Sequence, residues 1–162
     1  MDVSAALIGT LERVSAILAG EHIGHRLIGG LAVSMLSRPR ATEDVDLIIA
    51  VGEPERARVL SALASEFRVV QDQLMQFQRA TIWRILLASP SGSADEVVVV
   101  DFLLADREPY TSAVSNAMPV RIGSVAVPVA RKENLIAVKR ISNRPIDVID
   151  IESLQNASDD TP

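Results

Sequence analysis

Apolar positions recur along the chain with two different periods, which predicts both helices and strands. Helical spacing of apolar residues from Val3 to Leu18 predicts an N-terminal amphipathic helix, residues 1–20, ended by Gly20. Short apolar runs rich in β-branched residues predict strands. These runs are residues 25–28, a run that begins at Asp44, residues 67–70, 82–87 and 97–104, and two short strands around Gly123.

Further helices are predicted between and after these strands. Gly29-Gly30 opens one that continues to about Leu36 and is stopped by Pro39, and the others cover 55–65, 108–117, ENLIAVKRIS and RPIDVIDIESL. Residues 71–79 fit either a polar helical turn or a partly extended loop. The loop SPSGSADE predicts that strands 82–87 and 97–104 pair antiparallel.

This order of elements predicts an α+β fold, an α/β mixed sheet of small size flanked by helices. The 162 residues suggest a single domain without repeats or a linker. Within it we expect an N-terminal helix (1–20), a core (27–104), C-terminal helices (131–156) and a frayed polar tail (157–162).

Composition then excludes several classes of protein. The chain has no cysteine, which excludes disulfides and thiolate metal sites, and its two histidines disfavour a zinc centre. No apolar run approaches the roughly 20 residues of a membrane span, and the first residues lack a basic leader. We therefore expect a cytoplasmic protein with no membrane partner.

The net charge of −5 has the wrong sign for a broad face that binds nucleic acid. A local basic groove remains compatible with an acidic protein. The candidates for it are Arg26, Arg38, Arg40, Arg79, Arg84, Arg131, Lys132, Lys139, Arg140 and Arg144.

Three carboxylates within apolar strands are the candidates for chemistry. Asp44 and Asp46 are two positions apart on one strand, so both side chains leave the same face. Their repulsion must be answered by a cation, a shared proton or open solvent. Asp101 lies in VVVVDFLL, where an uncompensated acid is costly to bury. A hard divalent cation, which prefers oxygen ligands, would account for all three carboxylates.

Four motifs follow one another along the chain: Gly29-Gly30, Arg40-x-Thr42-x-Asp44-x-Asp46, Asp101 in its apolar strand, and Leu-Ile-x-x-Lys139 followed by Arg144-x-x-Asp147-x-x-Asp150. The first three resemble the nucleotidyltransferase superfamily, which has a polymerase β-like fold. The fourth resembles the group of AbiEii-type toxins and related minimal nucleotidyltransferases. Many relatives have Gly-Ser where this chain has Gly-Gly, which removes one hydroxyl contact to phosphate.

The resemblance implies roles for the matching residues. Asp44, Asp46 and Asp101 would bind Mg²⁺ (or Mn²⁺) and, with Lys139 and Asp147, form the catalytic set. Asp147 and Asp150 would either orient Lys139 and Arg144 or help to activate the acceptor. The residues implied in nucleotide binding are Gly29, Gly30, Arg40, Thr42, Lys139 and Arg144.

The expected function is therefore transfer of a nucleoside monophosphate from an NTP to an acceptor hydroxyl on an RNA end, a protein or a small molecule. The resemblance also implies a role in a toxin–antitoxin or stress module, with an antitoxin or a second copy of the chain as partner. Two alternatives stay open, which are a non-catalytic nucleotide-binding or protein-interaction module and an RNA-binding protein without catalysis.

Overall fold

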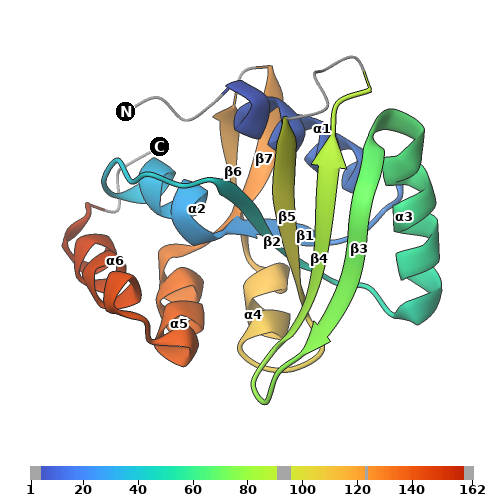
Figure 1. Ribbon diagram of the computed structural model, residues 1–162. Helices are drawn as coiled ribbons and strands as arrows, with labels where there is room; N and C mark the ends of the chain where they lie inside the picture. Colours follow the sequence, from blue (N-terminus) through green and yellow to red (C-terminus); the bar gives the residue numbers. More distant parts are fainter. Residues whose placement is uncertain (1–4, 91–95, 123, 159–162) are drawn as a thin grey trace.

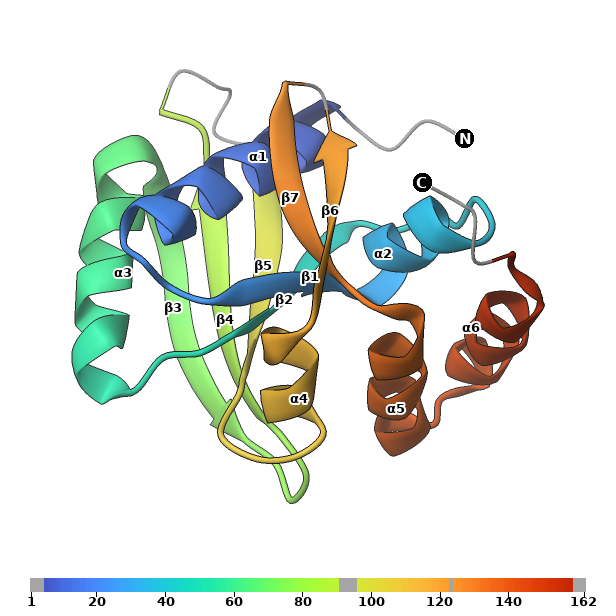
Figure 2. The same ribbon diagram turned by 180° about the vertical axis from the view of Figure 1, so that it is seen from behind.

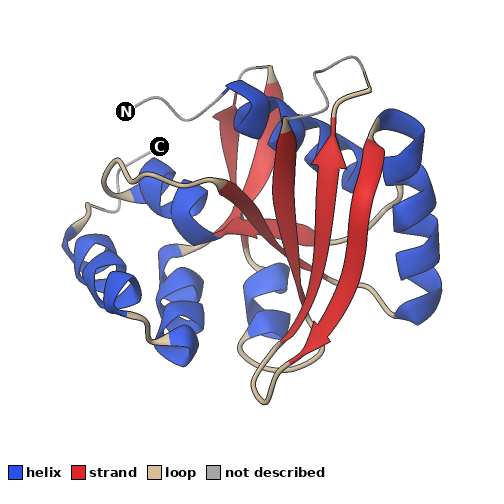
Figure 3. Ribbon diagram, in the orientation of Figure 1, coloured by secondary structure: helices blue, strands red, loops and turns tan. Residues whose placement is uncertain are grey.

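The computed structural model describes residues 5–90, 96–122 and 124–158, which form a seven-stranded mixed sheet with helices packed around it (Figures 1 and 3). The strands lie in the order β3-β4-β5-β2-β1-β7-β6. They are β1 (His25–Ile28), β2 (Asp44–Ile49), β3 (Arg68–Gln76), β4 (Thr81–Ala88), β5 (Val97–Leu104), β6 (Ala117–Ile122) and β7 (Val125–Ala130). The helices are α1 (Ala5–Gly20), α2 (Gly29–Leu36), α3 (Glu53–Glu66), α4 (Tyr110–Ser115), α5 (Lys132–Ser142) and α6 (Pro145–Asn156).

This architecture confirms the predicted mixed α/β class and the order of its elements. The predicted antiparallel pairing of β4 with β5 is also confirmed. Some predictions fall on residues outside the described ranges: the first four residues of the N-terminal helix, most of the SPSGSADE loop, the turn at Gly123 and the end of the tail, 159–162.

Two elements differ from the expectation in length. Strand β3 continues through most of the segment left open, because its pairing with β4 runs from Arg68↔Ala88 to Gln76↔Thr81. It lies at the edge of the sheet and its side chains are mostly exposed, so the segment lacks the apolar alternation that reveals a half-buried strand. Helix α4 is shorter than predicted, because Pro109 precedes its first turn and β6 begins at Ala117.

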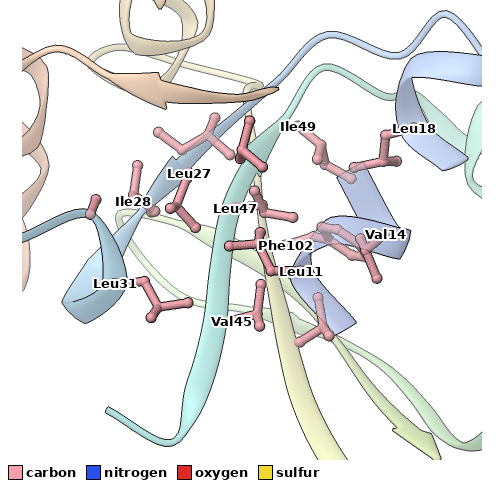
Figure 4. Close-up of a cluster of buried hydrophobic side chains, with 14 of the residues drawn as sticks. Leu11, Val14, Leu18, Leu27, Ile28, Leu31, Val45, Leu47, Ile49 and Phe102 are labelled. Atoms are coloured by element: carbon pink, nitrogen blue, oxygen red, sulfur yellow. The ribbon is translucent and has the colours of Figure 1, made fainter. Parts of the chain in front are cut away.

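Helix α1 covers one face of the sheet, the face turned toward the viewer in Figure 2. Its residues Leu11, Val14 and Leu18 lie beside Leu47 and Phe102 in a cluster of fully buried side chains (Figure 4). Burial of this size is the main stabilising contribution to such a fold. Because side chains alternate along a strand, the even-numbered positions of β2 are directed to the other face.

Strand register aligns the charged positions of that other face in one row. Ile28 of β1 lies opposite Asp46 of β2, Asp46 lies beside Asp101 of β5, and Asp101 lies opposite Arg84 of β4. Neighbouring strands are about 4.8 Å apart. The fold therefore places two acids and one arginine side by side, directly below the turn into α2.

Candidate functional site

A cavity of about 770 Å³ opens above this row, and it is lined by all of the predicted catalytic, metal-binding and nucleotide-binding residues. Asp150, the last acid of the fourth motif, is not among the lining residues. The sheet forms its floor, the turn into α2 and the loop before β2 form one side, and α5 with the start of α6 form another. The lining residues from the sequence prediction are Gly29, Gly30, Arg40, Thr42, Asp44, Asp46, Asp101, Lys139, Arg144 and Asp147.

The carboxylates of Asp44 and Asp46 face this cavity without a hydrogen-bond or ion-pair partner among the described residues. Burial, followed by the charges of Asp101 and Asp44, raises the pKa of Asp46 from 3.8 to about 7. Burial and the Asp101 charge also raise the pKa of Asp44. Ionisation of both carboxyl groups is therefore unfavourable in the chain alone, and a bound cation would stabilise their ionised forms.

Asp101 is held differently, although it belongs to the same row. Arg84 donates from Nε to Oδ1 over 2.8 Å and from Nη2 to Oδ2 over 2.7 Å, so both carboxylate oxygens accept from one guanidinium. The Asp101 residue is only 6% exposed. Sequence analysis gave Arg84 only as one of ten candidates for a local basic groove and missed this pairing.

The residues fit a divalent metal in donor chemistry, since carboxylate oxygens are what Mg²⁺ and Mn²⁺ prefer. Asp44 and Asp46 would hold it. Across the described ranges, however, no three acidic or histidine side chains converge on one point as a ready-made metal site. Asp101 instead forms an ion pair with Arg84. The three-carboxylate metal site stays a prediction.

The glycine pair has two distinct structural tasks. Gly29 has φ +70°, and a Cβ there would come within 2.3 Å of Asp46 Oδ2. A Cβ on Gly30 would come within 2.6 Å of Arg40 Nη1 and 2.9 Å of the Thr42 side chain. Both glycines therefore let charged or polar side chains pack against the start of α2.

A second group of charges closes the far side of the cavity. Lys139 is 5% exposed, and its Nζ donates to Asp150 Oδ2 over 2.9 Å and to Asp147 Oδ1 over 3.3 Å. Asp147 Oδ2 also accepts from Ser142 Oγ, from the Arg144 backbone N–H and from Arg144 Nε. Although burial opposes ionisation, the hydrogen bonds from Arg144 and Ser142 hold the pKa of Asp147 well below its usual value.

Asp150 ties this group to the loop before β2. Its carboxylate lies 3.4 Å from Arg38 Nη2 and 3.4 Å from Arg40 Nη1, in addition to its contact with Lys139. Asp150 is itself fully buried. Of the two predicted roles for the downstream acids, these contacts support the one in which Asp147 and Asp150 orient the cations around them.

Comparisons with known proteins place the fold. No protein-family model matches the sequence, and no curated protein is significantly similar to it. Among solved structures, a proposed nucleotidyltransferase of Thermotoga maritima matches with a TM-score of 0.64 at 12% identity, over 96% of this chain and 96% of that one. A lincomycin-bound lincosamide antibiotic adenylyltransferase matches with a TM-score of 0.55 at 13% identity, over 96% and 99%.

A proposed nucleotidyltransferase from H. pylori matches with a TM-score of 0.52 at 17% identity, over 85% of this chain. The chain spans 59% of that protein and 66% of a second H. pylori protein. These matches confirm the nucleotidyltransferase fold that the motifs implied. The finer resemblance to the AbiEii-type group finds no support in them and stays a prediction.

In the part of the chain that the structure describes, none of the helices combines the length and the apolar character needed to cross a bilayer.

Proposed function

We propose that the protein is a metal-dependent nucleotidyltransferase that moves a nucleoside monophosphate from an NTP to an acceptor hydroxyl. One observation carries this proposal. On a nucleotidyltransferase fold, the uncompensated carboxylates of Asp44 and Asp46 face the same cavity as the cationic loop and helix starts. A cavity with acids on its floor and cations on its wall suits a triphosphate that arrives with a divalent ion.

The cationic wall is suited to the phosphates. Arg40 and Arg144 line the cavity, and Arg40 lies beside Gly30 in the first turn of α2. Helix N-termini bind anions through free backbone N–H groups. Lys139 also lines the cavity and adds positive charge, although two of its three donors are taken by Asp147 and Asp150. In this proposal Arg40 and Arg144 bind the nucleotide directly, while Lys139 holds the wall in place.

The chemistry would be an in-line displacement at the α-phosphorus. The acceptor oxygen forms the new bond, the bond to the β-phosphate oxygen breaks, and pyrophosphate leaves. Asp101 would accept the proton of the acceptor hydroxyl. A Mg²⁺ or Mn²⁺ ion on Asp44 and Asp46 supplies Lewis-acid stabilisation of phosphoryl charge when bound.

The motif resemblance supports the finer parts of the proposal. The acceptor hydroxyl would belong to an RNA end, a protein or a small molecule. The setting would be a cytoplasmic toxin–antitoxin or stress module of the AbiEii-like kind. An antitoxin or a second copy of this chain would be the protein partner.

The test is transfer of label from each α-labelled NTP, with Mg²⁺ or Mn²⁺, into RNA, protein and small-molecule fractions of a lysate. The double variant Asp44→Asn/Asp46→Asn should lose at least about a hundredfold of the rate, since a metal contributes several kcal/mol to the transition state. The matched control is Glu43→Gln, which removes an exposed acid beside the pair and should retain transfer.

Two outcomes would overturn the proposal. Transfer that survives in the double variant would show that the carboxylate pair is not the active centre. Wild-type protein that is folded and binds NTP, but labels no fraction, would favour the non-catalytic nucleotide-binding alternative.

A further inference from the structure

The site contains a permanent cation of its own. Arg84 and Asp101 are direct neighbours in the antiparallel pairing of β4 with β5, and their two hydrogen bonds are 2.8 and 2.7 Å long. Two parallel bonds between a guanidinium and a carboxylate form the strongest type of side-chain ion pair. An arginine is charged at every physiological pH, so this charge stays on the floor of the cavity.

The neighbouring acids lack such a partner. Neither Asp44 nor Asp46 has an ion pair in the described parts of the chain, although Asp46 lies next to Asp101 in the sheet. Three carboxylates and one guanidinium leave two negative charges. One divalent cation would balance these two negative charges.

We propose that Arg84 takes the place of one of the two cations that a three-carboxylate site can hold, so that the chain binds one divalent ion, on Asp44 and Asp46. Arg84 is then a positioning residue that fixes Asp101 and neutralises it. The inference takes from the proposed function only the location of the metal. It differs from the general scheme in which all three carboxylates share two ions.

Asp101 can keep its proposed role within this arrangement. Each carboxylate oxygen has two acceptor sites, and Arg84 uses one site on each. A free site therefore remains for an acceptor hydroxyl. The Arg84 side chain is 40% exposed toward the cavity region, so one of its faces is still accessible to solvent or substrate.

The test counts Mn²⁺ ions bound to the full chain without nucleotide, by electron paramagnetic resonance of free Mn²⁺ during a titration. Wild type should bind one ion per chain. Arg84→Gln frees Asp101 and should bind a second, while Arg84→Lys keeps the charge and should bind one. Adding Asp101→Asn to Arg84→Gln should return the count to one.

The matched control is Arg79→Gln, which removes an exposed arginine that lines the same cavity and should leave the count at one. Two ions in wild type would overturn the inference, because Arg84 would then move aside for metal. An unchanged count in Arg84→Gln, or no ion in wild type, would overturn it as well. Circular dichroism establishes that each variant is folded, and the wild-type count remains decisive if one is not.

The Mn²⁺ count tests this inference and label transfer tests the proposed function, so one can fail while the other stands. One ion in wild type and two in Arg84→Gln, without any transfer, would leave this inference standing while the proposed function falls. Transfer together with two ions in wild type would do the reverse.

Discussion

Two groups of acids lie around the candidate site, and only one of them is paired with cations of the chain. Asp147 and Asp150 are fully buried, yet each accepts hydrogen bonds from two cationic side chains of the chain. Asp44 and Asp46 are less buried and accept none among the described residues. The pKa of Asp147 is accordingly lowered, whereas burial and neighbouring acids raise that of Asp46 to about 7.

The comparison shows that burial of an acid does not by itself mark a functional residue. The α6 acids (Asp147 and Asp150) form a closed network that holds α5, α6 and the loop before β2 together. The β2 acids (Asp44 and Asp46) lack compensation within the chain, and that deficit points to a ligand cation. Variants of the two groups should therefore change stability in opposite directions.

The largest effect is expected from Asp150→Ala. It removes the carboxylate 2.9 Å from buried Lys139 and leaves that cation with the longer contact to Asp147. Breaking a buried pair from one side costs about 3–5 kcal/mol, or roughly 10 °C in Tm for a domain of this size. Thermal unfolding measures it. Glu152→Ala, an exposed acid on the same helix, should change Tm by about 1 °C or less.

Gly29→Ala should be the next most damaging change. An alanine must adopt φ +70° and place its Cβ within 2.3 Å of Asp46 Oδ2, which together cost about 2 kcal/mol. Gly9→Ala is the control, since nothing lies within 4 Å of its added Cβ on helix α1, and it should stabilise by about 0.5–1 kcal/mol. Equal urea midpoints for both variants would contradict the close approach at Gly29.

Asp46→Asn should have the opposite sign and stabilise the metal-free protein by roughly 1–2 kcal/mol at pH 8. Because folding raises the pKa of Asp46 from 3.8 to about 7, the folded state loses stability as pH rises between these values. The gain from Asn should thus be absent near pH 3.5 and complete above pH 7. Thermal unfolding in EDTA across this range checks it, and a gain independent of pH would refute the charge explanation.

Mg²⁺ should reverse the order of stability of wild type and Asp46→Asn. Added metal stabilises a protein that binds it in the folded state, so it should raise the Tm of wild type more than that of Asp46→Asn. If Mg²⁺ raises both equally, the pair does not hold the ion.

The smallest effect is expected from Arg144→Gln, which tests the exposed edge of the closed network. The Arg144 side chain is 64% exposed, and exposed ion pairs contribute about 0.5 kcal/mol. Asp147 keeps its bonds to Lys139, Ser142 and the backbone N–H of residue 144. The urea midpoint should shift slightly with an unchanged slope, and a loss above about 2 kcal/mol would show that the guanidinium is essential to the network.

The sequence was sufficient to predict most of the fold, because the buried strands and amphipathic helices carry strong periodic signals. It failed at β3, where an exposed edge strand is defined by pairing with β4 and not by its own pattern. The three acids of the cavity floor were predictable as well, since two share a strand face and the third interrupts an apolar run.

The partners of the acids were harder to predict. Arg84 lies opposite Asp101 in the observed register of β4 and β5, in which Leu87 also pairs with Val98. A slip of one residue would turn the Arg84 side chain to the other face of the sheet. A loop of uncertain length between the strands leaves that register undetermined from sequence. The burial of Lys139 could have been predicted, because Lys139 follows the buried Leu135 by four positions and therefore lies on the same face of the helix.

The parallel pairing of β2 with β5 has a consequence for the order of folding. Asp46 and Asp101 become neighbours only after α3, β3 and β4 have been traversed, whereas β4 and β5 are joined by a local hairpin. Contacts between distant segments form more slowly than local ones. We therefore expect Arg84 to reach Asp101 before Asp46 does, so that the chain would bring a neutralising charge into the step that joins the two acids.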